Sequence, residues 1–119
     1  MRLSTLAIAA LIMTAPAYAH DSKGPNGGHV TDLGPYHAEL TAKDKVVEVY
    51  LTDPANKPVS VAGFKGVAIL SVRNQSERVE LQPAGANKLS GTAGVPVPQN
   101  PRGVVRVTLP DGKTNQAKF

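Results

Sequence analysis

Short runs of alternating apolar and polar residues make up most of this chain, and turn-forming residues break them every six to twelve positions. A strand points successive side chains to opposite faces, so a period of two is typical of half-buried β-strands. No segment keeps a helical period. The pattern predicts an all-β fold, with strands at 29–33, 36–42, 45–52, 66–73, 77–82, 88–93, 103–109 and 114–119.

The number of strands limits the architecture. Seven or eight short antiparallel strands in a chain of 119 residues favour a small β-sandwich or a partly open barrel. Most strands have one apolar face, as in antiparallel sheets with one wet side. The segment 66–73 is apolar on both faces, so we expect it in the centre of the sheet.

The N-terminal segment has the three parts of a secretory signal peptide. Residues 1–19 contain the basic Arg2, an apolar stretch over 6–13 and the small-x-small site Ala17-Tyr18-Ala19. That apolar stretch is shorter than the roughly 20 residues that span a bilayer. We expect the signal peptide to be cleaved and the mature protein to be bacterial and periplasmic. No insertion of the mature chain into a membrane is expected. A flexible leader (20–28) and one all-β domain (29–119) should follow.

Composition argues against several function classes. Without cysteine the chain has no disulfide, thiolate metal ligand or cysteine nucleophile. No serine-hydrolase, phosphate-loop or zincin motif is present, so we expect no enzyme. The 13 Lys and Arg exceed the nine Asp and Glu only mildly, stand singly in the sequence and accompany just 4% aromatic residues. Nucleic acid is therefore not an expected partner.

The three histidines, His20, His29 and His37, are concentrated near the start of the mature chain. Imidazole is the commonest metal ligand and binds copper, zinc or nickel without a thiol neighbour. Cleavage after Ala19 would add the new terminal amine of His20, a nitrogen pair suited to Cu(II). The alternative interpretation is a polar leader and one exposed strand histidine.

Two carboxylates extend this candidate metal site. A turn at residues 43–44 would place Glu39 opposite Glu48, and His37 opposite Tyr50, on the outer face. Like charges directly opposite each other destabilise a sheet, and a cation would remove the repulsion. Glu39 and Glu48 are therefore candidate oxygen ligands.

Two alternatives weaken that argument. Both carboxylates could be solvated or paired with a Lys or Arg on a neighbouring strand. A turn at residues 44–45 would keep the same faces but move Glu39 opposite Tyr50.

Several short motifs resemble those of a known group of proteins. They are Gly24-Pro25-Asn26-Gly27-Gly28-His29-Val30, Tyr36-His37-Ala38-Glu39-Leu40, Val49-Tyr50-Leu51-Thr52-Asp53 with Lys57-Pro58-Val59, Leu81 through Leu89, and Val107-Thr108-Leu109-Pro110. The chain resembles small secreted bacterial proteins with a P-H-G-G leader, which are related to the N-terminal segment of periplasmic adaptor subunits of heavy-metal efflux pumps. The resemblance implies copper, zinc or nickel handling. Its leader histidine falls at Asn26 here, a poor ligand for such metals.

These observations predict a periplasmic accessory protein that binds a divalent transition metal such as copper, zinc or nickel. It would act as a carrier, a buffer or a partner of an efflux component. The candidate ligands are His20, His29, His37, Glu39 and Glu48. The alternative is a non-catalytic interaction domain without a metal, which binds a partner protein through an edge strand.

Overall fold

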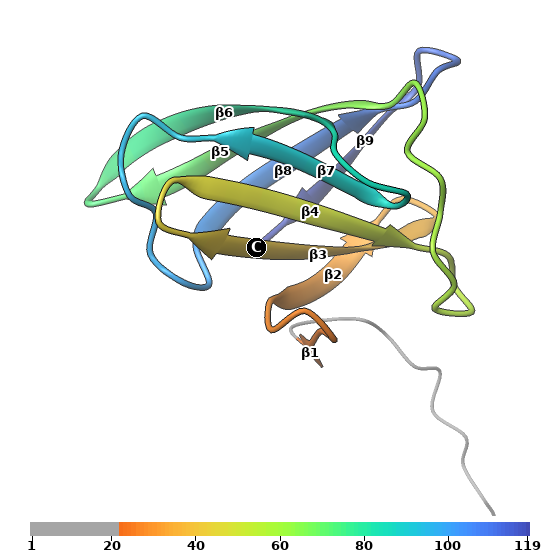
Figure 1. Ribbon diagram of the computed structural model, residues 1–119, viewed down its shortest axis with the longest axis horizontal. Coiled ribbons are helices and arrows are strands. Elements are labelled where there is room, and N and C mark those ends of the chain that lie inside the picture. The colour runs from red at the N-terminus through yellow and green to blue at the C-terminus, as the bar shows by residue number, and fades with distance from the viewer. Residues whose placement is uncertain (1–21) are drawn as a thin grey trace, which may run out of the picture.

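Residues 22–119, which the computed structural model describes, form one antiparallel sheet of nine strands (Figure 1). The predicted signal peptide and His20 lie outside the described residues. The strands are β1 (Ser22–Lys23), β2 (His29–Leu33), β3 (Tyr36–Lys43), β4 (Val46–Thr52), β5 (Lys65–Val72), β6 (Gln75–Pro83), β7 (Lys88–Thr92), β8 (Arg102–Thr108) and β9 (Thr114–Lys118). The all-β prediction is confirmed, and the eight predicted strands correspond to β2 through β9.

The sheet has the order β1-β2-β3-β4-β7-β6-β5-β8-β9. After β4 the chain crosses to β5, and β7 returns between β4 and β6 (Figure 1). The sheet curls until β2 contacts β9 near its far end. Of the two expected architectures, the structure is therefore the partly open barrel.

The core fills the inner face of this curl. On β4 the alternation is complete, because Val47, Val49 and Leu51 are fully buried while their neighbours are half-buried or exposed. The largest fully buried side chains come from both halves of the sheet and, in Val61, from the connection between β4 and β5: Leu33, Leu40, Leu51, Leu70, Leu81, Leu89, Val47, Val49, Val61, Val79, Val105 and Val107. The strand that was expected in the centre, β5, is an interior strand between β6 and β8, but the middle strand of the nine is β7.

The β3–β4 turn differs from the register first considered. Lys43 pairs with Val46, so Asp44 and Lys45 form a two-residue turn. Asp44 has a φ of 53°, which aspartate tolerates better than most residues do. The turn at residues 44–45 is therefore the one that forms.

This register corrects two predicted pairs. Glu39 lies opposite Tyr50 rather than Glu48, and His37 lies opposite Thr52 rather than Tyr50. Because the turn sits one residue later than in the first alternative, every partner on β4 moves by two residues and the faces are unchanged. The argument for a cation between two opposed carboxylates is therefore lost.

The described part of the predicted leader packs against the sheet. Ser22 and Lys23 pair with Val30 and His29, and the 24–28 loop folds back beside β3. Between residues 22 and 119 there is no helix long and apolar enough to cross a membrane.

Two substitutions on β4 test which face holds the core. Leu51→Ala removes a fully buried side chain and should lower the free energy of unfolding by about 2–5 kcal/mol. Val46→Ala, at a position 42% exposed, should change it by less than about 0.5 kcal/mol. Urea unfolding monitored by circular dichroism measures both. Equal losses would contradict the assigned faces.

Candidate functional site

The outer face of β2, β3 and β4 holds most of the polar residues singled out from the sequence. Residues opposite each other in an antiparallel ladder share a face. Asp32 and His37 therefore form one cross-strand pair on this face, and Glu39 lies beside Val30 and Tyr50 in the next row. Glu48 lies opposite Thr41, one row further along β4.

His29 lies on the other face of β2. Its partner in the ladder is Leu40, a core residue, and the imidazole itself is exposed at the start of the strand. His37 instead lies opposite Asp32. Strand alternation thus separates the two histidines, although only seven positions lie between them in the sequence.

Glu39 is buried, with 4% of the residue exposed. Its Oε2 accepts hydrogen bonds from the backbone N–H groups of Asn26 and Gly28, and its Oε1 accepts one from Asn26 Nδ2, each at 2.9 Å. Hydrogen bonds to a carboxylate are among the stronger ones in proteins. Both oxygens therefore hold the 24–28 loop, which gives Glu39 a structural role.

The glycines of this loop are needed for its close approach to β3. A Cβ on Gly24 would sit 2.2 Å from the carboxyl carbon of Glu39, and one on Gly28 would sit 2.2 Å from the backbone oxygen of Leu40. Gly27 has a φ of 81° and donates its N–H to Gly24 in a tight turn with Pro25 at its second position. The Gly-Pro-Asn-Gly-Gly sequence is thus explained by packing on Glu39.

Glu48 is paired with a cation from a neighbouring strand, as one of the sequence alternatives proposed. Lys88 Nζ lies 2.8 Å from Glu48 Oε2 and 5.9 Å from the centre of the Tyr50 ring. The hydrogen bond to Glu48, together with its negative charge, raises the pKa of Lys88 above the ordinary value of 10.5. Lys88 thus supplies the positive charge beside Glu48.

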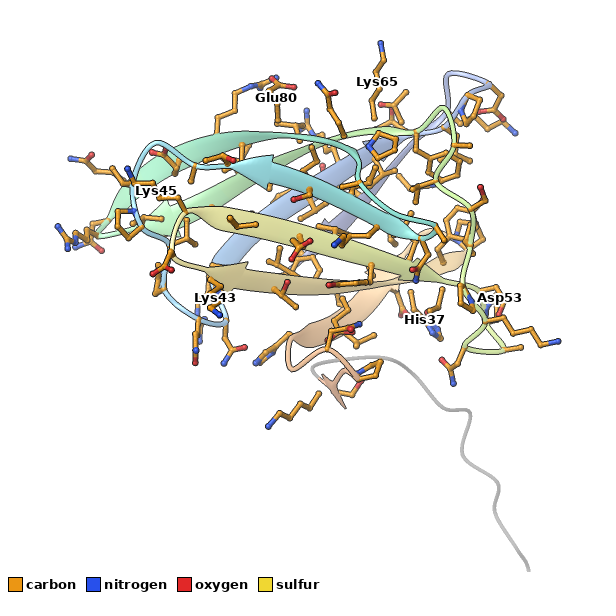
Figure 2. All side chains as sticks on the ribbon, viewed as in Figure 1. His37, Lys43, Lys45, Asp53, Lys65 and Glu80 are labelled. Atoms are coloured by element: carbon orange, nitrogen blue, oxygen red, sulfur yellow. The ribbon has the colours of Figure 1, made fainter. Side chains whose placement is uncertain are left out.

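His37 is the histidine with the most organised surroundings. Its Nδ1 lies 3.3 Å from Asn56 Oδ1, and its Nε2 lies 3.8 Å from Asp32 Oδ1. The turn after β4 holds Asn56 in place, because Asp53 Oδ1 accepts the backbone N–H groups of Ala55 and Lys57. Figure 2 shows His37 beside the loop that begins at Asp53.

An amide oxygen only accepts hydrogen bonds, so the contact with Asn56 Oδ1 is a hydrogen bond in the tautomer that carries the proton on Nδ1. In that tautomer the Nε2 lone pair points toward the Asp32 carboxylate, 3.8 Å away. An imidazole nitrogen and a carboxylate oxygen are both donor types that bind divalent transition metals.

The five predicted ligands do not form one cluster. His37 and Asp32 are near each other, Glu39 and Glu48 are engaged elsewhere, His29 faces away, and His20 lies outside the described residues. Within residues 22–119, no group of three or more His, Asp or Glu side chains could hold a metal ion.

Sequence reasoning missed Asp32 and Asn56. Pairing the predicted strands 29–33 and 36–42 around Gly34-Pro35 would have placed Asp32 opposite His37. The position of Asn56 depends on a loop conformation that no local pattern indicates. No family model, curated protein or solved structure matches this chain.

The role of Glu39 is tested by Glu39→Gln. The amide would turn an N–H toward donors of the 24–28 loop, at a cost of about 1–3 kcal/mol. We expect the amide hydrogens of Asn26 and Gly28 to exchange faster, measured by NMR, while those of β4 keep their protection. Glu48→Gln is the matched control on the next strand and should leave the loop protected. Unchanged exchange in Glu39→Gln would contradict the structural role.

The Lys88 pair has a defined pH dependence. Glu48→Gln should lower the pKa of Lys88 toward 10.5, because the hydrogen bond and the negative charge that raise it are weakened or lost. In the unchanged protein the stabilisation is present below 10.5 and is lost as the pH rises through the raised folded-state pKa. NMR titration of the Lys88 Cε resonance measures the shift. A pKa that stays raised in the variant would contradict this cause.

Proposed function

We propose that this chain is a periplasmic accessory protein that binds a divalent transition metal as cargo, with His37 and Asp32 at the centre of the ligand set. The observation that carries the proposal is the approach of two atoms of metal-binding type, His37 Nε2 and Asp32 Oδ1, to 3.8 Å. The resemblance to proteins related to efflux adaptors supports the same class of ligand.

The separation of the two atoms suits a metal ion after a small adjustment. Bonds of about 2.0–2.2 Å to nitrogen and oxygen put two ligand atoms of a tetrahedral zinc roughly 3.4 Å apart. The side chains need to approach by only a few tenths of an ångström. Asn56 supplies the second hydrogen bond that commonly orients a ligating imidazole.

The exposure of the pair fits a carrier or a buffer. The His37 side chain is 17% exposed and the Asp32 side chain 39% exposed, so water and further ligands can reach a bound ion. An open site with few protein ligands exchanges its metal more readily than a closed one. Transfer to an efflux component would use that open side.

His20 is the further ligand that we propose. It lies outside the described residues, so its participation remains a prediction. The reason to retain it is chemical: cleavage after Ala19 would join its imidazole to the new terminal amine, a nitrogen pair that suits Cu(II).

The proposal is tested by titrating the purified protein with Cu²⁺, Zn²⁺ and Ni²⁺ and measuring heat. We expect His37→Ala and Asp32→Asn to weaken binding of the preferred metal by more than about tenfold. Asn56→Ala should weaken it by roughly tenfold through the orientation of His37. His20→Ala tests the proposed further ligand in the same assay.

His29→Ala is the matched control, because it removes an imidazole from the other face of β2. We expect its affinity to stay within about twofold of the unchanged protein. If this control lost as much affinity as His37→Ala, the site would not be on the outer face. If the unchanged protein took up none of the three metals at micromolar concentration, the metal function would fail and the interaction domain without a metal would replace it.

A further inference from the structure

Far from His37 in the sheet order, the outer face of β5, β6, β8 and β9 gathers positive charge. We call it the basic face and define it by five exposed cations, Lys65, Arg78, Arg102, Arg106 and Lys118. Glu80 is the one carboxylate among the described residues whose side chain shares this face. The sequence as a whole has equal numbers of acidic and basic residues once these six are set aside.

Strand alternation explains how scattered residues come together here. The ladder places Ile69 beside both Arg78 and Val104, and Val67 beside both Glu80 and Arg106. Odd-numbered residues of β5 and even-numbered residues of β6, β8 and β9 therefore point outward. The cations surround a half-buried apolar centre of Val67, Ile69 and Val104.

Four of the cations follow the direction of β8. Arg102 and Arg106 lie on β8 itself. Lys118 on β9 is opposite Val104, and Lys65 on β5 is opposite Thr108, so each step from Arg102 through Lys118 and Arg106 to Lys65 advances two residues and crosses to the adjacent strand. The spacing of a sheet then puts neighbouring Cα atoms roughly 8 Å apart, in a stripe about 20 Å long. Such a stripe matches a chain of regularly spaced negative groups.

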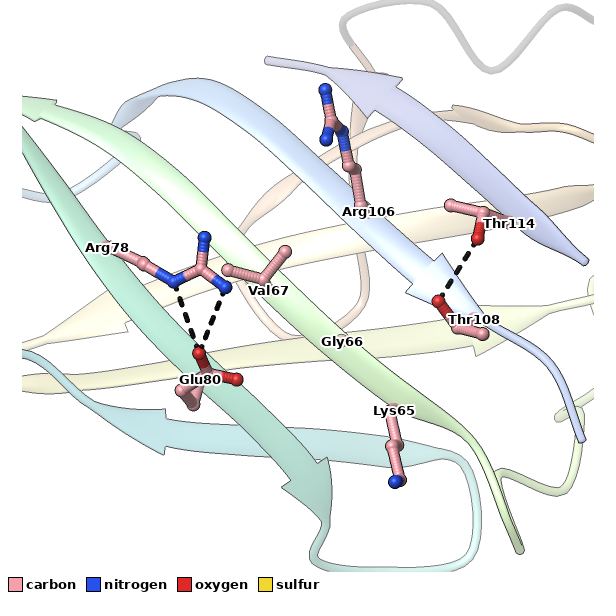
Figure 3. Close-up of a pocket in the computed structure, with 8 residues that line it drawn as sticks. All are labelled: Lys65, Gly66, Val67, Arg78, Glu80, Arg106, Thr108 and Thr114. Carbon is pink, nitrogen blue, oxygen red and sulfur yellow. Dashed lines mark hydrogen bonds and ion pairs between the residues drawn. The ribbon is translucent and has the colours of Figure 1, made fainter. Parts of the chain in front are cut away.

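Among the described residues, no acidic side chain pairs with the four cations of this stripe. Outside the stripe, Arg78 is neutralised by Glu80, with its Nη2 3.1 Å from Oε1. Arg106 donates only to the neutral Gln116, at 3.0 Å. Figure 3 shows Arg106 and Lys65 on the same side of the sheet as the Arg78–Glu80 pair. The residues around them line a shallow hollow of about 310 Å³.

Hydrogen-bonding side chains lie between the cations. Thr108 and Thr114 contact each other at 3.2 Å on this face, and Gln116 and Ser71 lie on it as well. Hydroxyl and amide groups can exchange their hydrogen bonds for those of sugar hydroxyls. Arginine adds a planar fork that binds carboxylate or sulfate groups at two points.

The same face is poorly suited to two other anionic partners. None of its described side chains is aromatic, so it has no platform on which nucleic-acid bases could stack. The outer side of a curled sheet is convex, and Val46 and Val95, the two large apolar residues that are exposed among residues 22–119, lie elsewhere. A flat membrane would therefore meet few of the cations, and the apolar centre of this face is only half-exposed.

We propose that the basic face binds an acidic polysaccharide, with the sugar chain running along β8. Arg102, Arg106, Lys118 and Lys65 bind its negative groups, while Thr108, Thr114 and Gln116 bind its hydroxyls. This site is independent of the metal proposal, because it uses other strands and none of the same residues. It gives the protein a means of attachment to an anionic glycan in its surroundings.

The test measures binding of the purified full chain to immobilised heparin and polygalacturonate over a range of salt concentrations. Arg102→Gln/Arg106→Gln should weaken binding by about tenfold or more and lower the dependence of log affinity on log salt by roughly one to two. The matched control is Lys43→Gln/Lys45→Gln, which removes the same charge at the β3–β4 turn (Figure 2). We expect its affinity to stay within about twofold.

A second variant tests the proposal in the opposite direction. Glu80→Gln releases Arg78 from its partner and should tighten polysaccharide binding several-fold. Equal losses in the two double variants would overturn the proposal, since net charge alone would then explain binding. Tighter binding to a 20-nucleotide oligothymidylate or to vesicles with anionic lipid than to either polysaccharide would also overturn it, in favour of that partner.

Discussion

One curled sheet has to form its core without a second layer. Antiparallel strands with one apolar face usually bury that face against another sheet or a helix. Here the nine strands of the described residues wrap around their own inner side until β2 reaches β9, so that Leu33 and Ala117 belong to the same core. Burial of the inner positions on every long strand fixes the register, since a shift by one residue would turn the apolar set outward.

The curl also determines where chemistry can occur. The inner face is filled by aliphatic side chains, so ligands can reach only the outer face, the loops and the sheet ends. The outer face has two parts that differ in the charge of their side chains. Around β2, β3 and β4 it holds His37, Asp32, Glu39 and Glu48, whereas across β5, β6, β8 and β9 it holds five cations and one carboxylate. Two proposals on one small domain are compatible because they use different residues.

The sequence was sufficient for the strands and for the faces of most of them, because burial in a one-sided sheet imposes a period of two. It left the β3–β4 register between two alternatives, which differ by one residue in the position of the turn. Asp44 adopts a positive φ and closes a two-residue turn, which takes Glu39 away from Glu48. A local turn preference is too weak to settle this, whereas the complete ladder does.

The candidate site was harder to predict than the fold. Alternation shows that Glu39 points outward, yet not that the 24–28 loop covers it with three N–H donors. The histidines appeared clustered because they are close in sequence. On paired strands, however, the face on which a side chain lies depends on its place in the alternation and not on its distance along the sequence. His29 and His37 thus take opposite faces, and the closest acidic neighbour of His37 comes from β2. In the basic face the reverse occurs, since residues that stand singly in the sequence meet across four strands.

Glu39 connects these points through the chemistry of position 26. The P-H-G-G pattern has a histidine where this chain has Asn26, whose backbone N–H and side-chain amide both donate to Glu39. An imidazole N–H at the same position could donate to the same carboxylate oxygen, so histidine and asparagine are both able to anchor the loop. On this argument, position 26 serves first to fasten the loop to β3. The loop held in this way leads directly into the pairing of Ser22 and Lys23 with Val30 and His29, so Glu39 also fixes where β1 adds to the sheet.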